Sequence, residues 1–428
     1  MPVHGTPIVG GPLLPLNSSN NRLKQQIAKV YTSNGGFIDV WRDCPLMGGQ
    51  GCTAPKFMTN GIANQVTVTL PRPFDNFDEA GDPRGHGTVG IGNVVQFWVY
   101  DSNVLANGRL VYQGSIDAYT PQIDTAGTEN ISVTLTPFDT ILGDVAFIGT
   151  QNFGVAGAAG TYVDPATMFL WPFQNVNPVT GQPYTYPLTQ GSIATTTGTA
   201  YQNQWHNQNT SSFFESCRIL APINYYWRVN PDKTIDFTRA SATARHTFIV
   251  GKHLTAPQYA KDAQTLKNYV WVKGSGVQAT AQGADIGQYG QRTLTIVEQR
   301  LYDQQSCNRY AAAALAQNDV VTYRCTISVS DIRGDGTGLG YDIELIRVGD
   351  TCRIVNPFYN QPFTLWDSAI WDSATWDYSA SGVLNQVVVI SGLTYKFDSV
   401  DLELSLLQPS QDRFLVDLAN QFATYTTN

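Results

Sequence analysis

The sequence predicts a mainly β protein of the α+β class, with two antiparallel β-barrel-like domains, an inserted and less regular middle domain, and a few short helices. The first observation behind this prediction is composition, because 38 Gly and 22 Pro residues interrupt helices and the 11% of aromatic residues suit pleated sheets. The second is the alternation of apolar and polar residues in many short segments. The third is length, since 428 residues are enough for about two to four domains with their own cores.

Charged residues are scarce in this chain. They make up 14% of it, against about a quarter in an average soluble domain, so uncharged polar residues must cover most of the surface. The 26 Lys and Arg residues against 34 Asp and Glu residues give a net charge of -8, which argues against a basic surface for nucleic acid. The sequence contains no window of about 18 apolar residues, so it predicts no membrane-spanning segment.

The N-terminal part is predicted to form an extended arm followed by the first β-barrel-like domain. Residues 1–24 contain repeated Pro and Gly without periodicity, which is typical of an arm. Alternating segments across residues 25–145 predict the strands of the first domain. The pair Asn107-Gly108 predicts the tip of a hairpin. One strand places three residues on a single face, namely Val66, Val68 and Leu70.

Residues 146–250 are predicted to form the inserted middle domain. Its first part, the insertion at residues 146–210, is rich in Gly, Pro and Thr and has no sustained period. A short helix is expected next, with Ser211 or Ser212 as its N-terminal cap. Two strands are then expected around a Pro-Asp-Lys turn at residues 231–233.

Residues 251–428 are predicted to form the second β-barrel-like domain. The strongest helix signal of the chain is an alanine run at residues 303–316. Alternating segments after this helix predict further antiparallel strands, and residues 363–381 are predicted to form a Trp/Asp loop. Residues 412–422 place apolar side chains on one helical face, so this segment is expected to close a core or dock on a neighbouring subunit.

The Trp/Asp loop contains the repeat W-D-S-A-x, with indoles at Trp366, Trp371 and Trp376. A carboxylate follows each indole, at Asp367, Asp372 and Asp377. A spacing of five matches neither the period of a strand nor that of a helix, so a looped conformation that presents three indoles is predicted. We favour packing or subunit contact for the indoles, with glycan contact as the alternative. Paired carboxylates can also serve glycosidase chemistry, but that depends on a separation in space that sequence does not supply.

The sequence contains no familiar catalytic or metal-binding motif. It lacks a nucleophile elbow, a phosphate-binding loop, a dinucleotide fingerprint and zinc-type spacing of Cys and His. The Asp/Gly run at residues 331–340 lacks the spacing of a calcium loop and predicts a flexible connection. We therefore predict that the protein is not an enzyme and has no catalytic residue, no metal site and no cofactor.

The six cysteines are scattered and include no C-x-x-C pair. Most are expected to be buried free thiols. Cys44 and Cys52, eight residues apart in a Gly-rich loop, are the best candidates for a disulfide if the protein meets an oxidising medium.

Eight segments of strand and turn sequence follow one another in a recognisable order. With their first residues they are FIDVWRDC (Phe37), NQVTVTLPRPF (Asn64), GNVVQFWVYD (Gly92), LVYQGSIDAY (Leu110), WRVNPDKTIDF (Trp227), NYVWVKG (Asn268), DIGQYGQR (Asp285) and IRVGDTCRI (Ile346). In this order they resemble the baseplate hub or tail hub proteins of tailed bacteriophages, over roughly residues 25–410. The chain departs from the family pattern at Lys233, where glycine is expected, in the insertion at 146–210 and in the W-D-S-A repeat.

The resemblance implies a structural virion protein that forms a homotrimer. In that family two β-barrel domains per chain form a pseudo-hexameric ring, which joins the six-fold tail tube to a three-fold tip and lines or closes the DNA channel. The implied partners are further copies of the chain, the tail tube or distal tail protein, the tape measure protein, and a tip or fibre protein. DNA is implied as a partner only in transit, during genome ejection.

The implied location is the tail tip or baseplate of the virion. The first residues lack the basic and apolar regions of a secretion signal, so the sequence predicts synthesis in the cytoplasm of the host bacterium without export by the Sec route. The alternative function is a tail-tip carbohydrate-binding or cell-wall-degrading protein that acts at host attachment. The Trp/Asp repeat and the total of 9 Trp residues motivate this alternative.

Overall fold

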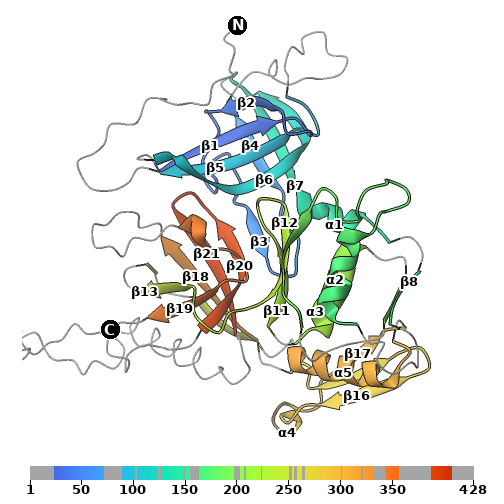
Figure 1. The fold of residues 1–428 in the computed structure, drawn as a ribbon. Coiled ribbons are helices and arrows are strands. Elements are labelled where there is room, and N and C mark those ends of the chain that lie inside the picture. Colours follow the sequence, from blue (N-terminus) through green and yellow to red (C-terminus); the bar gives the residue numbers. More distant parts are fainter. Residues whose placement is uncertain are drawn as a thin grey trace, which may run out of the picture.

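The structure is a computed structural model that describes residues 24–71, 89–101, 104–123, 127–147, 150–154, 163–196, 203–206, 209–222, 224–249, 253–254, 258–262, 266–299, 301–319, 322–330, 343–355 and 387–406. Within these residues the protein is mainly β, with two curled sheets, smaller sheets and short helices (Figure 1). The predicted fold class is confirmed. The arm up to residue 23, the loop at 331–340, the Trp/Asp repeat and residues 412–422 lie outside the described residues.

The first curled sheet contains six antiparallel strands in the order β2-β1-β5-β6-β7-β4. Their bounds are Lys24–Tyr31 (β1), Phe37–Trp41 (β2), Val66–Leu70 (β4), Val94–Asp101 (β5), Val104–Ile123 (β6) and Glu129–Pro137 (β7). In β4, Val66, Val68 and Leu70 are buried and the two threonines between them are half-buried. Because successive side chains of a strand face opposite sides, one face of β4 packs on the core, and the predicted face is confirmed.

The hairpin of β5 and β6 is present, but the predicted position of its turn is wrong. Asp101 pairs with Val104, so the chain turns between these residues and not at Asn107-Gly108. Gly108 lies instead where the pairing of the two strands is irregular. A Cβ atom at Gly108 would overlap the ring of Tyr100, so the glycine serves a close approach within the hairpin.

The second curled sheet combines strands from the C-terminal part of the chain with one strand from the N-terminal part. Its order is β13-β19-β20-β21-β18-β14, and β3 pairs with β20 outside this path. The bounds are Lys56–Met58 (β3), His246–Ile249 (β13), Gln258–Asp262 (β14), Thr322–Ser330 (β18), Thr351–Val355 (β19), Val387–Tyr395 (β20) and Ser399–Leu406 (β21). Because β3 lies between β2 and β4 in the sequence, its pairing with β20 connects the first sheet to the second.

The two curled sheets share one continuous hydrophobic core. Its members include Val68, Phe97 and Ile116 of the first sheet and Ile327, Tyr395 and Leu402 of the second. Interiors of this kind are close-packed and resist relative movement of the surfaces that form them. The sheets lie one above the other in Figure 1, with β3 between them.

A third unit of helices and small sheets packs beside the curled sheets (Figure 1). Its elements are Phe138–Thr140 (η2), Ile141–Asp144 (α1), Thr150–Phe153 (β8), Pro165–Gln174 (α2), Thr189–Ile193 (β9), Asn203–His206 (β10), Thr210–Leu220 (α3), Tyr225–Val229 (β11), Thr234–Arg239 (β12), Tyr269–Lys273 (β15), Gln278–Gln282 (β16), Ile286–Tyr289 (α4), Thr293–Val297 (β17) and Gln304–Asn318 (α5). Its core is aromatic, and the ring of Phe169 stacks on Phe214 and Phe237 with centroid distances of 4.0 and 4.5 Å.

The helices of this unit match the sequence predictions in part. The helix predicted at residues 303–316 is confirmed as α5. The helix predicted after residue 210 is confirmed as α3, but the predicted cap is wrong, because Asn209 Oδ1 accepts from the N–H of Ser212 at 2.9 Å. Helix α2 was not predicted, although its start carries a recognisable signal: Asp164 caps it and Pro165 occupies its first turn.

The predicted domain boundaries after residues 145 and 250 stay predictions. The structure shows which sheet or core each neighbouring element joins. β13, before residue 250, lies in the second curled sheet. Helix α5 and the strands β15 to β17, after residue 250, pack in the same aromatic core as α2 and α3. The third unit therefore draws on segments from both sides of residue 250.

Candidate functional site, the Asp350 junction

The turn of the β11–β12 hairpin supplies one half of the candidate site. The N–H of Lys233 donates to the carbonyl of Asn230 at 3.0 Å, and Asp232 Oδ1 accepts from the N–H of Thr234 at 3.1 Å. Lys233 has a φ of 68°, in the left-handed region that favours glycine. This backbone conformation suits the glycine that the resemblance implies at this position, and Lys233 therefore occupies a strained position.

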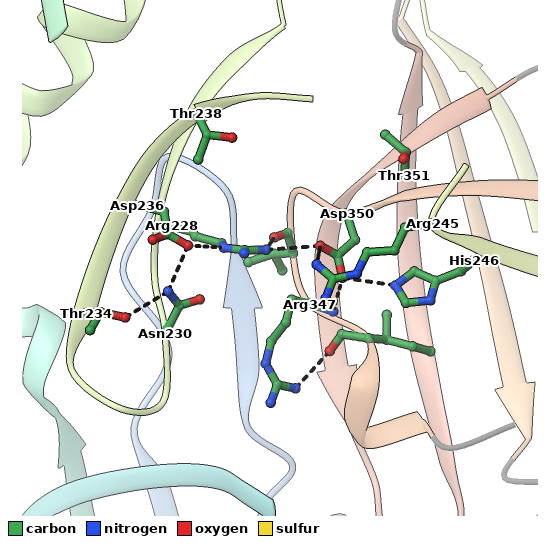
Figure 2. A network of polar contacts seen from close by, with 12 residues as sticks. Arg228, Asn230, Thr234, Asp236, Thr238, Arg245, His246, Arg347, Asp350 and Thr351 are labelled. Carbon is green, nitrogen blue, oxygen red and sulfur yellow. Dashed lines mark hydrogen bonds and ion pairs between the residues drawn. The ribbon is translucent and has the colours of Figure 1, made fainter. Parts of the chain in front are cut away.

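Arg228, in β11, joins the hairpin to the second curled sheet (Figure 2). Its Nε donates to Asp236 Oδ2 at 3.0 Å across the hairpin. Its Nη1 donates to Asp350 Oδ1 at 3.2 Å and to the carbonyl of Val348 at 2.7 Å. The side chains of Arg228 and Asp350 are only 12% and 4% exposed. Because the guanidinium fork serves two carboxylates at once, one side chain connects the two units.

Asp350 is the centre of this junction. Its Oδ1 also accepts from Arg245 Nη1 at 3.0 Å, and its Oδ2 lies 2.9 Å from His246 Nε2 and accepts from the N–H of Arg347 at 3.1 Å. Burial by itself raises the pKa of Asp350, but the hydrogen bond with His246 and the charges of Arg228 and Arg245 outweigh it and hold the pKa below its usual range. The carboxyl group is therefore ionised at neutral pH.

Gly349 allows the Asp350 loop to approach the hairpin. Its φ is 82°, and a Cβ atom there would overlap the ring of Tyr226. Arg228 and Asp350 are separated by 122 residues in the sequence. They belong to WRVNPDKTIDF and IRVGDTCRI, so two of the segments that carry the family resemblance meet at this junction.

A buried ion pair forms a second connection, between the two curled sheets. Lys24 Nζ lies 2.5 Å from Glu344 Oε1, and the two side chains are 7% and 0% exposed. The hydroxyl of Tyr395 donates to the same oxygen at 2.7 Å, and Lys24 also donates to the carbonyl of Phe397. Lys24 is the first residue of β1, and Glu344 lies in the turn Ile343–Leu345 (η3). The pair therefore attaches the beginning of the first sheet to the second.

Residues just after β3 form a third connection, to the hairpin. The N–H of Trp227 donates to Asn60 Oδ1 at 2.9 Å, and the N–H of Asn60 donates to the carbonyl of Trp227 at 2.9 Å. One asparagine thereby satisfies both backbone groups of a residue in β11. Together with the pairing of β3 and β20, this contact links the first sheet, the second sheet and the hairpin through residues 56–60.

The chemistry of these residues is that of ion pairing and hydrogen bonding. Among the described residues, no group of three or more His, Cys, Asp and Glu side chains is arranged to hold a metal ion. No helix in the described part of the chain is long and apolar enough to span a bilayer. All six cysteines are free thiols, five of them buried and Cys44 half-buried, so the predicted buried thiols are confirmed and no bond joins Cys44 to Cys52.

The structure does not place the site residues proposed from sequence. Trp366, Trp371 and Trp376 lie outside the described residues, as do Asp367, Asp372 and Asp377. Their role in subunit or glycan contact stays a prediction. Arg228 and Asp350 were not predicted as a pair, and the sequence signal for them was weak, because each of the two resemblance segments contains several charged residues.

Two solved structures share this fold over nearly the whole chain. The 43 kDa tail protein of prophage MuSo2 from Shewanella oneidensis is 11% identical, with a TM-score of 0.51, and the match covers 90% of this chain and 99% of that one. The tail protein from Neisseria meningitidis is 12% identical, with a TM-score of 0.50, and the match covers 89% and 96% of the two chains. The chain has the fold of phage tail proteins.

Sequence comparison adds no family to this finding, because no protein-family model and no curated protein matches the chain. The similarity to the tail proteins is therefore one of fold, at an identity of 11–12%. At this identity the shared property is the arrangement of elements, and function has to be argued from the residues of this chain.

Proposed function

We propose that this protein is a structural component of a bacteriophage tail and acts as a trimeric hub at the tail tip or baseplate. The observation that carries the proposal is the extent of the fold match, 90% of this chain and 99% of the MuSo2 tail protein. A match of this extent includes both curled sheets and the unit beside them. The similarity therefore extends over the arrangement of all three units and is not limited to one domain that many proteins share.

The pair of curled sheets supports a role at a symmetry mismatch. Three copies of a chain with two curled sheets place six sheets around one axis, which suits a six-fold tail tube, while the trimer itself suits a three-fold tip. Such a role requires the two sheets of one chain to keep a single relative orientation. The shared core, the pairing of β3 with β20 and the Lys24–Glu344 ion pair supply that rigidity.

The charge of the chain supports passage of DNA without retention. Proteins that hold DNA neutralise its phosphates with Lys and Arg and gain affinity from the release of counterions. This chain has 26 such residues against 34 carboxylates. The proposed partners are accordingly the tail tube or distal tail protein, the tape measure protein and a tip or fibre protein, with DNA only in transit. We assign no catalytic step to the protein.

The assembly state tests this proposal. We expect the purified full-length protein to have three times the chain mass by light scattering after size exclusion, and electron cryomicroscopy to show a three-fold ring that contains six curled sheets. In virions the ring is expected at the distal end of the tail tube. A stable monomer that is absent from purified virions would overturn the proposal.

A further inference from the structure

A cleft lies where the first curled sheet meets the β11–β12 hairpin. The enclosed volume is about 20 Å³, which is room for about one water molecule. The first sheet and the turn after it contribute Tyr112, Phe138 and Asp139, and the hairpin contributes Asn230 and Lys233. The titratable side chains that line it are Tyr112, Asp139 and Lys233. A carboxyl group from the turn after β7 and an ammonium group from the hairpin therefore line the same cleft.

Asp139 is a buried carboxyl group with incomplete hydrogen bonding. The residue is 4% exposed. Its Oδ2 accepts from the N–H of Ala63 at 2.6 Å, whereas its Oδ1 is buried and has no hydrogen-bond partner in the described part of the chain. Burial raises the pKa of Asp139 to about 6, although the backbone N–H groups of Ala63 and Thr140 lower it. The charge of Asp139 therefore changes between pH 5 and 7.

Lys233 is the cation that lines this cleft, and in the structure it is engaged elsewhere. Its Nζ lies 3.7 Å from the ring centroid of Phe138, the residue that precedes Asp139. Burial lowers the pKa of Lys233, but the ordinary value is far above neutral, so the ammonium stays charged between pH 5 and 7. With its ammonium on Phe138, Lys233 forms no ion pair with Asp139. This arrangement is the one expected when the carboxyl group of Asp139 is protonated and neutral.

The remaining titratable groups near Asp139 do not change charge in this pH range. Burial raises the pKa of Tyr112 far above neutral, and the charge of Asp139 raises it further. Cys52 faces Tyr112, and burial raises the pKa of its thiol to about 12. Both groups stay neutral, so Asp139 is the titrating group of the cleft and Lys233 is its available counter-ion.

We propose that Asp139 and Lys233 form a pH-responsive latch between the turn η2, which follows the first curled sheet, and the β11–β12 hairpin. When Asp139 is protonated, the Lys233 ammonium packs on the ring of Phe138. When Asp139 loses its proton to solvent, its buried carboxylate has an oxygen without a partner, and the flexible lysine stem brings the ammonium to it. The departure from glycine at position 233 thereby acquires a role, because a glycine there would bring no cation to the cleft.

Local hydrogen exchange of the full-length protein tests the latch at pH 5 and pH 7.5. The readout is exchange in residues 57–64 and 225–237, with each variant compared with the unmodified protein at the same pH. Lys233→Met is expected to speed exchange in these segments several-fold at pH 7.5 and much less at pH 5. In the Asp139→Asn background this pH dependence of the Lys233→Met effect is expected to disappear, and Lys233→Arg is expected to preserve protection.

Asp319 provides the matched control. It lies at the end of α5, outside the cleft, and burial together with Asp285 raises its pKa to about 6 as well. Asp319→Asn is expected to leave the pH dependence at the hairpin unchanged. An equal effect of Lys233→Met at both pH values, or a pH dependence that survives Asp139→Asn, would overturn the proposal. If Lys233→Met does not fold, the comparison of the unmodified protein with Asp139→Asn still decides. Hydrogen exchange in the hairpin is then expected to depend on pH in the unmodified protein and not in Asp139→Asn.

Discussion

Asp350 and Arg228 illustrate how this chain uses its few charges. Charged residues are 14% of the sequence, and yet the ion pairs of Arg228 with Asp236 and Asp350 and of Lys24 with Glu344 have side chains no more than 12% exposed. Removing a charge from water is costly, so a buried pair adds little net stability compared with apolar residues. A buried pair here fixes the position of one unit on another. The reason is that each buried charge meets its opposite charge only when the two units pack in this one arrangement.

Asp350→Asn removes the charge at the centre of the junction and leaves Arg228 with Asp236 alone. Since the buried guanidinium of Arg228 then keeps Asp236 as its carboxylate partner but loses its bond to Asp350, we expect the free energy of unfolding to fall by about 2 kcal/mol at pH 7. The folded-state pKa of Asp350 is below its usual value, so its stabilising contribution is present above the ordinary aspartate pKa of about 3.9 and is lost as pH falls through the folded value. Urea unfolding of both proteins at pH 7 and pH 3 measures this difference.

An exposed ion pair serves as the control for this measurement. Lys396 and Asp401 lie 2.8 Å apart with side chains 42% and 30% exposed. Asp401→Asn is expected to change the free energy of unfolding by no more than about 1 kcal/mol, because solvent screens such pairs. Equal effects of Asp350→Asn and Asp401→Asn would contradict the central role of Asp350.

At the scale of single elements, the strands followed from the sequence better than the helix ends did. In β4 the alternation of Val and Thr reports directly which face is buried. The start of α3 was misplaced because Asn209, Ser211 and Ser212 are all good caps, and only the backbone conformation decides which one precedes the first turn. Helix α2 was missed because it contains Pro172 and five of its ten residues are buried, so no polar face marks its period.

Asn209→Ala tests the cap that the structure assigns to α3. Its side chain satisfies the N–H of Ser212, and loss of a cap of this kind is expected to lower the free energy of unfolding by about 1 kcal/mol. Ser211→Ala is the matched variant, since its hydroxyl donates to Asn209 and caps no N–H. Urea unfolding of both variants measures the difference. A larger loss for Ser211→Ala than for Asn209→Ala would restore the cap predicted from the sequence.

At the scale of the whole molecule, contacts between distant segments decide how the units sit together. Strand β3 lies between two strands of the first sheet in the sequence but pairs with β20 of the second sheet. Just after β3, Asn60 Oδ1 accepts a hydrogen bond from the N–H of Trp227 in the hairpin. These connections meet around one shared core. The proposed role as a hub between assemblies of different symmetry requires this rigidity, because relative movement of the two sheets would change the surfaces that contact the two neighbours.

Lys24→Met tests the buried connection between the two sheets. It leaves Glu344 buried without its cation, so we expect the free energy of unfolding to fall by about 3–5 kcal/mol and limited proteolysis near residue 24 to accelerate. Lys56→Met is the matched control, because Lys56 also reaches the second sheet, but its pair with Glu403 is 40% and 48% exposed. The control is expected to cost no more than about 1 kcal/mol. Similar losses for both variants would show that Lys24 does not anchor the sheets.

The sequence by itself determined the β class, several strands with their buried faces, helix α5, and a motif order that resembles tail hub proteins. These features are local, because periodicity and turn residues report how each segment meets its own surroundings. Only the tertiary structure decided that Arg228 reaches Asp350 across 122 residues, that β3 pairs with β20, and that Lys233 and Asp139 line one cleft. The physical reason is that a burial pattern says a side chain is covered, whereas the identity of its partner depends on how complete surfaces pack together.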